Sequence, residues 1–142
     1  MMNKTTINYK DFDEMKAHDM IEKGYEEAKV YLSDRRRLGS LIVKVERKMK
    51  ALPYMPDLTP IVNIYVSLLR HYMMNQYRDV PYVALCVIVS SLLYLVDPFD
   101  YIPDSIPGIG LYDDKIVIFV CQDMVQPEIE DYREWRVSKG LE

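Results

Sequence analysis

The stretch PYVALCVIVSSLLYLV, residues 81–96, decides the fold. No charged residue occurs between Asp79 and Asp97. A helix that is apolar on every side is either the central helix of a core or a membrane segment. These 17 uncharged residues would extend about 25 Å as a helix, less than a hydrocarbon core of about 30 Å. We therefore expect a buried core helix; a buried strand and membrane insertion through Pro81–Val96 are the alternatives.

Helical periodicity continues on both sides of this stretch. Thr59-Pro60 is a typical helix start, and Pro127 is expected to kink or restart the last helix. Ser33 is a plausible N-cap for the helix that follows it. The sequence predicts an all-α fold class, a single small domain of five or six helices around a buried apolar helical hairpin. We expect helices over residues 12–32, 34–52, 59–77, 81–96, 114–126 and 127–138.

The composition is that of a globular protein. The chain has 142 residues, of which 49% are apolar and 28% charged, so one domain can bury a substantial core. Cys86 and Cys121 lie in apolar surroundings without CxxC spacing, which predicts buried thiols in a reducing compartment. The N-terminus has no apolar signal-peptide region. We expect a cytoplasmic location, with association at the inner membrane face as an alternative.

Basic residues concentrate in one segment. Residues 34–50 hold seven basic and two acidic side chains, whereas residues 97–142 hold four basic and eleven acidic ones. A solvated helix face explains the basic run; binding to an anionic membrane surface is the functional alternative. The acidic tail and the pI near 5.2 disfavour nucleic acid as the main partner. The candidate residues for an anionic surface are Arg35, Arg36, Arg37, Lys44, Arg47 and Lys48.

Residues 97–114, DPFDYIPDSIPGIGLYDD, carry five aspartates between two apolar segments. Each aspartate has a local explanation as a helix cap or turn residue. If they converge instead, carboxylates without histidine or cysteine suit Mg²⁺, Mn²⁺ or Ca²⁺. An acid/base pair and a partner-docking surface are further alternatives. The candidate metal ligands are Asp97, Asp100, Asp104, Asp113 and Asp114.

The sequence contains no motif of a zinc site, a phosphate-binding loop or a catalytic nucleophile. His18 and His71 have no HxxxH or HxxE partner, which disfavours zinc. No glycine-rich phosphate loop and no nucleophile elbow occurs in the sequence. No catalytic residue can be assigned. No cofactor is certain, and Mg²⁺, Mn²⁺ or Ca²⁺ is the candidate.

The segment LLYLVDPFDYIPDSIPGIGLYDD resembles the YkvA-like domain of unknown function, whose hallmark is an apolar helix followed by DPxDxIPDxIPxxGxxDD. The resemblance covers about residues 40–136, and Lys115 departs from it because the family usually has an apolar residue there. It implies a small helical domain over residues 34–142, with residues 1–33 as an N-terminal helical extension. It implies no established reaction.

These observations favour a non-enzymatic helical domain that binds a protein partner or the inner membrane surface. One alternative is a divalent-metal-dependent hydrolase or nuclease-like enzyme that uses the Asp97–Asp114 carboxylates. The other is a monotopic or integral membrane protein inserted through Pro81–Val96. The sequence does not specify an oligomeric state.

Overall fold

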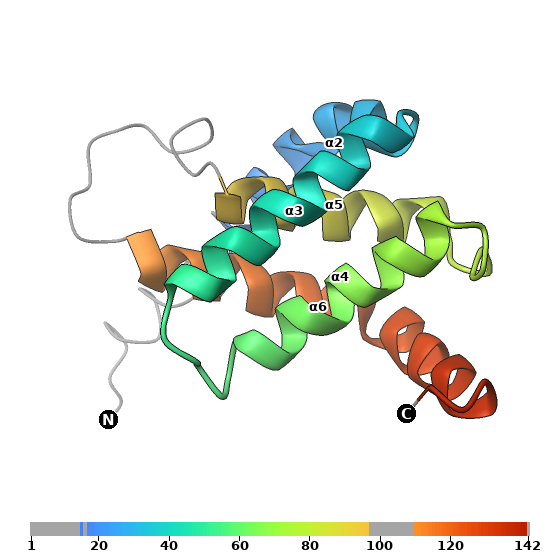
Figure 1. Cartoon of the computed structure of the whole chain (residues 1–142). Coiled ribbons are helices and arrows are strands. Elements are labelled where there is room, and N and C mark those ends of the chain that lie inside the picture. The colour runs from blue at the N-terminus through green and yellow to red at the C-terminus, as the bar shows by residue number, and fades with distance from the viewer. Residues whose placement is uncertain (1–14, 16, 97–109, 142) are drawn as a thin grey trace, which may run out of the picture.

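The computed structural model describes residues 15, 17–96 and 110–141, and the side chains of residues 111–114 are not among those described. The described residues form helices and no strand. The expected all-α fold is therefore confirmed (Figure 1). The elements are helical residues 17–23, α2 (Tyr25–Leu32), α3 (Arg35–Ala51), α4 (Thr59–Met73), α5 (Tyr82–Val96) and α6 (Gly110–Ser138).

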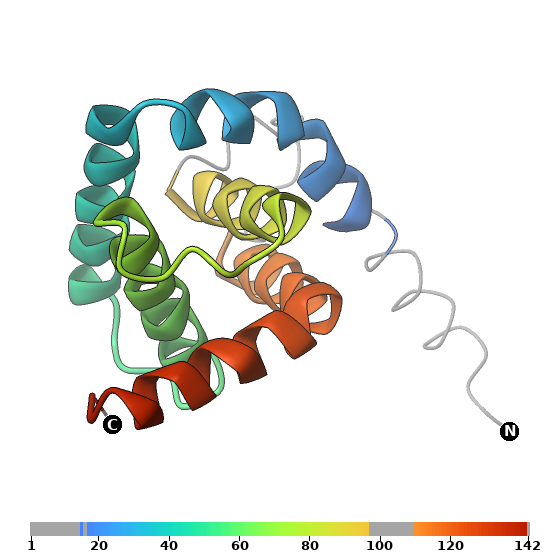
Figure 2. The ribbon, with the colours of Figure 1, turned by 90° about the vertical axis from the view of Figure 1, so that its right-hand side faces the viewer.

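Helix α5 is the centre of the fold. Every residue from Ala84 to Leu95 is buried, and the helix contacts α2, α3 and α6. Figure 2 shows α5 enclosed by the N-terminal helices, α3, α4 and the first half of α6. An apolar helix without a polar face needs neighbours on all sides, which explains this position. Among the described residues, no helix is both long enough and apolar enough to cross a membrane.

The N-terminal segment belongs to the same core as α5. Ala17, Ile21 and Ala28 are buried in the cluster that contains the α5 side chains. Helix formation is interrupted by a turn at Gly24, where a Cβ atom would lie 2.2 Å from Ser90 Oγ. Ser90 Oγ also donates a hydrogen bond of 2.6 Å to the Ile21 carbonyl. Glycine is therefore required at position 24 by the close approach of α5.

Helix α3 begins at an aspartate cap. The Asp34 carboxylate accepts hydrogen bonds from the backbone N–H groups of Arg36 and Arg37, which satisfies donors that the first helical turn leaves free. The predicted cap at Ser33 was wrong by one residue, because the Ser33 hydroxyl donates to the Val30 carbonyl at the end of α2. The connection between α2 and α3 thus consists of these two residues, each of which closes one helix end.

Helix α6 bends in the middle, as Pro127 predicted. The backbone leaves helical geometry at Val125, with φ −118° and ψ 15°, because proline cannot donate the hydrogen bond that would continue the helix. Figure 2 shows the second half of α6 turned away from α5 and passing across α4. The helix ends before Gly140, whose φ is +71°, a left-handed conformation that favours glycine.

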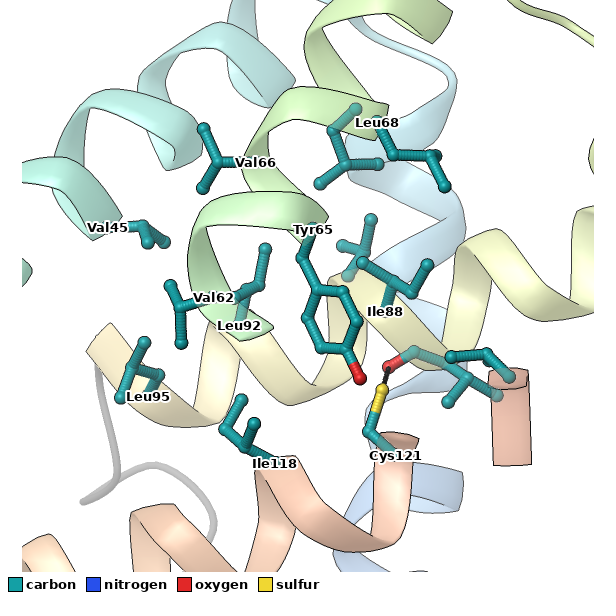
Figure 3. Packing of buried hydrophobic residues seen from close by; sticks show 14 of the residues in the cluster. Val45, Val62, Tyr65, Val66, Leu68, Ile88, Leu92, Leu95, Ile118 and Cys121 are labelled. Carbon is teal, nitrogen blue, oxygen red and sulfur yellow. Dashed lines mark hydrogen bonds between the residues drawn. The ribbon is translucent and has the colours of Figure 1, made fainter. Parts of the chain in front are cut away.

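Four helices meet in the apolar core. Figure 3 shows Val45 of α3, Val62 of α4, Leu92 of α5 and Ile118 of α6 around a common centre. Cys86 and Cys121 are both buried and free, as the sequence predicted. The Tyr65 hydroxyl donates to Gln122 Oε1 at 3.1 Å, so its polar end is satisfied within this apolar region.

Candidate binding surfaces

The outward side of α3 is basic. Leu38, Leu41, Ile42 and Val45 face the core at three- and four-residue steps, so the residues between them face outward. Val43, 44% exposed, lies among the outward side chains. We call the exposed basic side chains of this helix the basic face: Arg35, Arg36, Arg37, Lys44, Arg47 and Lys50.

The few acids on or beside α3 leave the basic face largely uncompensated. Asp34 Oδ2 lies 3.5 Å from Arg37 Nε at the start of the helix. Glu46 is the acid within α3, and it accepts hydrogen bonds of 2.7 and 2.9 Å from Arg70 of α4. The Arg70 guanidinium lowers the pKa of Glu46, so this carboxylate stays ionised at neutral pH. Its hydrogen bonds go to α4, and within the basic face its charge acts on Lys50.

Lys48 occupies a different place from the other predicted basic residues. Its side chain is half-buried, and Nζ donates a 2.5 Å hydrogen bond to the Leu95 carbonyl near the end of α5. A cation at a helix C-terminus also interacts favourably with the helix dipole. Lys48 therefore joins α3 to α5, whereas its neighbour Arg47 is exposed.

The predicted aspartate cluster lies mostly outside the described residues. This holds for Asp97, Asp100 and Asp104, while Asp113 and Asp114 belong to the first turn of α6 without described side chains. Among the side chains that the structure does describe, no group of three or more His, Cys, Asp or Glu residues is placed to hold a metal ion. Metal binding by the loop stays a prediction.

A buried polar cluster that the sequence did not predict joins α4 to the second half of α6. The Tyr132 side chain is fully buried, and its hydroxyl lies 2.5 Å from Ser67 Oγ and 2.6 Å from His71 Nδ1. Trp135 packs edge-on against the His71 ring, with centroids 5.0 Å apart. Ser67 and His71 are four residues apart on one helix, but nothing in the sequence pairs them with Tyr132.

Three adjoining hollows surround this cluster. The first, of about 610 Å³, lies along α3 and α4 from Lys50 to Gln76. The second, of about 360 Å³, lies between His71, Gln76 and Trp135, and the third, of about 790 Å³, lies beyond Trp135. Gln76 lines all three hollows, so they form one continuous surface. We call it the concave strip.

Comparison with known proteins agrees with the expected resemblance. Residues 84–120 match the family model described as "Protein of unknown function (DUF1232)". The chain is also 26% identical over 100 residues to "Uncharacterized membrane protein YkvA" of Bacillus subtilis (strain 168), an alignment that covers 70% of this chain and 88% of the relative. No solved structure matches the chain.

The family match covers most of the central helix and the start of α6. The family model begins at Ala84 in α5 and ends at Val120 in α6, so it covers the hairpin around which the other helices pack. The motif that the sequence shares with this family lies within that range. The resemblance to the YkvA-like domain of unknown function that the sequence predicted is therefore confirmed.

Proposed function

We propose that this domain binds anionic membrane surfaces through the basic face of α3. The proposal rests on an imbalance of charge: α3 carries six exposed cations but a single acid, Glu46, and this acid is hydrogen-bonded to Arg70. A surface of this kind attracts phosphate groups and repels other cations. Binding, rather than catalysis, is the activity that such a face supports.

The expected affinity follows from simple electrostatics. Each Lys or Arg near an anionic leaflet contributes about 1 kcal/mol, and the attraction falls off within a Debye length of about 10 Å at 0.1 M salt. Several residues of the basic face acting together would give reversible binding. Val43 adds an exposed apolar side chain in the middle of this face, where it could enter the interface between headgroups and acyl chains.

The comparison gives independent support for a membrane as the target. The Bacillus subtilis relative is named a membrane protein, and its alignment covers most of both chains. The proposal carries this association over to the present chain and assigns it to a described surface, the outward side of α3.

Vesicle flotation tests the proposal. Purified protein should float with vesicles that contain phosphatidylglycerol, should not float with pure phosphatidylcholine vesicles, and should be released as salt is raised. A variant with Arg36→Gln, Lys44→Gln and Arg47→Gln should lose most of the binding, because half of the basic face is neutralised.

The control removes the same charge elsewhere. Lys23→Gln, Arg133→Gln and Lys139→Gln change exposed cations outside α3 and should leave flotation nearly unchanged. Equal loss of binding in both triple variants would mean that net charge, not the basic face, controls binding. Absence of binding by the wild-type protein at low salt would contradict the proposal outright.

A further inference from the structure

The concave strip carries opposite charge at its two ends. At one end, Lys50 lines the first hollow beside the Glu46–Arg70 ion pair. At the other end, Asp79, Asp131 and Glu134 line the third hollow together with Arg78. The Arg78 side chain is engaged elsewhere: its guanidinium donates to the Tyr72 carbonyl and lies over the Tyr72 ring. Arg78 keeps its positive charge in these contacts, so the third hollow has three acids against one cation and is acidic, whereas Lys50 makes the α3 end basic. Lys139, which lines the second hollow, lies between the two ends.

The acids at the α6 end change the pKa of a neighbouring tyrosine, Tyr77. Burial raises the pKa of Tyr77, and the charges of Asp131 and Asp79 raise it further. Both carboxylates are exposed, as is Glu134, so this acidic end is open to a partner. Among the described residues, no ion pair is found for these three acids.

The middle of the strip has exposed apolar side chains next to polar ones, since His71, Gln76 and Lys139 also line the second hollow. Met74, 54% exposed, lines the first hollow together with Gln76. Trp135 is half-buried and lines both of the other hollows, and Leu141, 50% exposed, lines the second. Exposed apolar side chains with polar and charged groups around them are typical of protein interfaces, in which apolar anchors are surrounded by a polar rim.

We propose that the concave strip is a self-association surface whose partner is a second copy of this chain. In an interface with twofold symmetry, a residue of one protomer meets a different residue of its partner, and the reverse contact forms at the same time. A strip that is basic at one end and acidic at the other is complementary to itself in this arrangement. The Lys50 end of each protomer would lie against the Asp131–Glu134 end of its partner, with Met74 and Trp135 at the axis.

Charge complementarity selects a second copy over an anionic ligand. A simple anion would be attracted by Lys50 and repelled by Asp131 and Glu134, so it could use only part of the strip. A second copy satisfies both ends at once. The inference goes beyond membrane binding and does not depend on it, because most of the basic face lies outside the strip.

Charge reversal tests the proposal by analytical ultracentrifugation. The wild-type protein should form dimers whose dissociation constant rises with salt. Lys50→Glu places two acidic ends against each other and should weaken dimerisation by about tenfold or more, since each variant dimer contains two repulsive contacts. Glu134→Lys should also weaken dimerisation, because the new lysine and Arg78 offset Asp79 and Asp131 and the attraction for Lys50 is lost. Lys44→Glu and Glu130→Lys are matched controls outside the strip and should dimerise like the wild type.

Mixing the two single variants gives the decisive result. The Lys50→Glu protomer is acidic at both ends. The Glu134→Lys protomer keeps Asp79 and Asp131, so its α6 end is close to neutral. In a mixed dimer, Lys50 of one protomer meets an unchanged acidic end, and the glutamate introduced at position 50 of the other meets the lysine introduced at position 134, so neither contact is repulsive. Neither variant should dimerise well alone, and an equimolar mixture should form heterodimers. The double variant Lys50→Glu, Glu134→Lys should dimerise with itself again.

Two outcomes would overturn the inference. One is a wild-type protein that stays monomeric at low salt over a wide concentration range. The other is a mixture of the two single variants that remains monomeric while the wild type dimerises, since dimerisation would then use another surface. Vesicle flotation of the Glu134→Lys variant separates the two proposals, because loss of dimers without loss of flotation leaves membrane binding intact.

Discussion

Gly24 lies directly against Ser90: a Cβ atom at position 24 would come within 2.2 Å of the serine hydroxyl oxygen and 3.1 Å of its Cβ. The same hydroxyl donates to the Ile21 carbonyl, so a single serine both holds the N-terminal helix by a hydrogen bond and leaves no space for a side chain at position 24. The N-terminal helices and α5 are thus fixed in one relative position.

A double-mutant cycle should reveal this coupling. Gly24→Ala should destabilise the protein by about 1–3 kcal/mol through overpacking. Ser90→Ala should cost about 1 kcal/mol, because the Ile21 carbonyl loses the hydroxyl donor and keeps the Gly24 N–H. The double variant should cost less than the sum, since removal of the hydroxyl relieves the closest contact. Urea denaturation of the four proteins measures the free energies of unfolding. Strict additivity would contradict the packing described for this pair.

The Tyr132 hydroxyl should matter more for stability than that of Tyr65. Tyr132→Phe removes a partner from both Ser67 and His71, whereas Tyr65→Phe removes the bond to Gln122 and a weaker one to the Cys121 thiol. We expect a cost of about 1–2 kcal/mol for Tyr132→Phe and about 1 kcal/mol for Tyr65→Phe in urea denaturation. The His71 ring signals in NMR spectra should also shift in the Tyr132 variant and not in the Tyr65 variant. Unchanged ring signals in both would argue against the cluster.

Burial of Cys121 predicts a loss of stability at alkaline pH. Desolvation raises the pKa of this thiol from 9.0 to about 11, partly opposed by hydrogen bonds with Ser91 and Tyr65. Between these two values the unfolded chain has lost the thiol proton and the folded protein keeps it, so the free energy of unfolding falls as pH rises. The decline due to this group is at most about 1.4 kcal/mol per pH unit.

The Cys121→Ala variant isolates this contribution. It should be less stable than the wild type at pH 8 because it leaves a small cavity, but its stability should fall less steeply between pH 9 and pH 11. Ionisation of the tyrosines that do not interact with Cys121 is common to both proteins and cancels in the difference. Burial is the largest cause of the raised pKa of Tyr65, whose hydroxyl does interact with the thiol. Parallel pH profiles for the two proteins would show that the thiol does not contribute.

The Glu46–Arg70 ion pair should give a small, pH-dependent stabilisation. Both side chains are more than a third exposed, so the expected contribution is below about 1 kcal/mol. Because Arg70 lowers the pKa of Glu46, the stabilisation is present at neutral pH and is lost as pH falls through the range in which this carboxyl group becomes protonated. Glu46→Gln should therefore be slightly less stable than the wild type at pH 7 and equal to it at pH 2–3, as measured by thermal melting.

How much of this could be predicted from the sequence depends on the distance over which a signal acts. The absence of charge between Asp79 and Asp97 predicted the buried position of α5, and Pro127 predicted the bend of α6, because each signal is local. The contact of Tyr132 with His71 spans 61 residues and depends on the angle at which α6 bends. Periodicity does not specify that angle.

The sequence also could not distinguish the roles of two neighbouring basic residues of α3. Charge alone grouped Lys48 with Arg47, because both are cations in one amphipathic segment. Lys48 lies three residues after Val45, which is buried, and a long lysine side chain at the edge of an apolar face can extend its amine to a neighbouring helix. Which acceptor it finds, the Leu95 carbonyl, follows only from the position of α5.

Substitutions of Arg47 and of Lys48 should consequently affect different properties, membrane binding for Arg47 and stability for Lys48. Lys48→Met removes the donor to the Leu95 carbonyl while it keeps the aliphatic stem, so it should lower the free energy of unfolding by about 1 kcal/mol and leave vesicle flotation close to that of the wild type. Arg47→Gln should leave stability within about 0.5 kcal/mol and weaken flotation. If Lys48→Met reduced flotation as strongly as Arg47→Gln did, the membrane would contact a side of α3 that the structure places against α5, and the proposed surface would have to be redrawn.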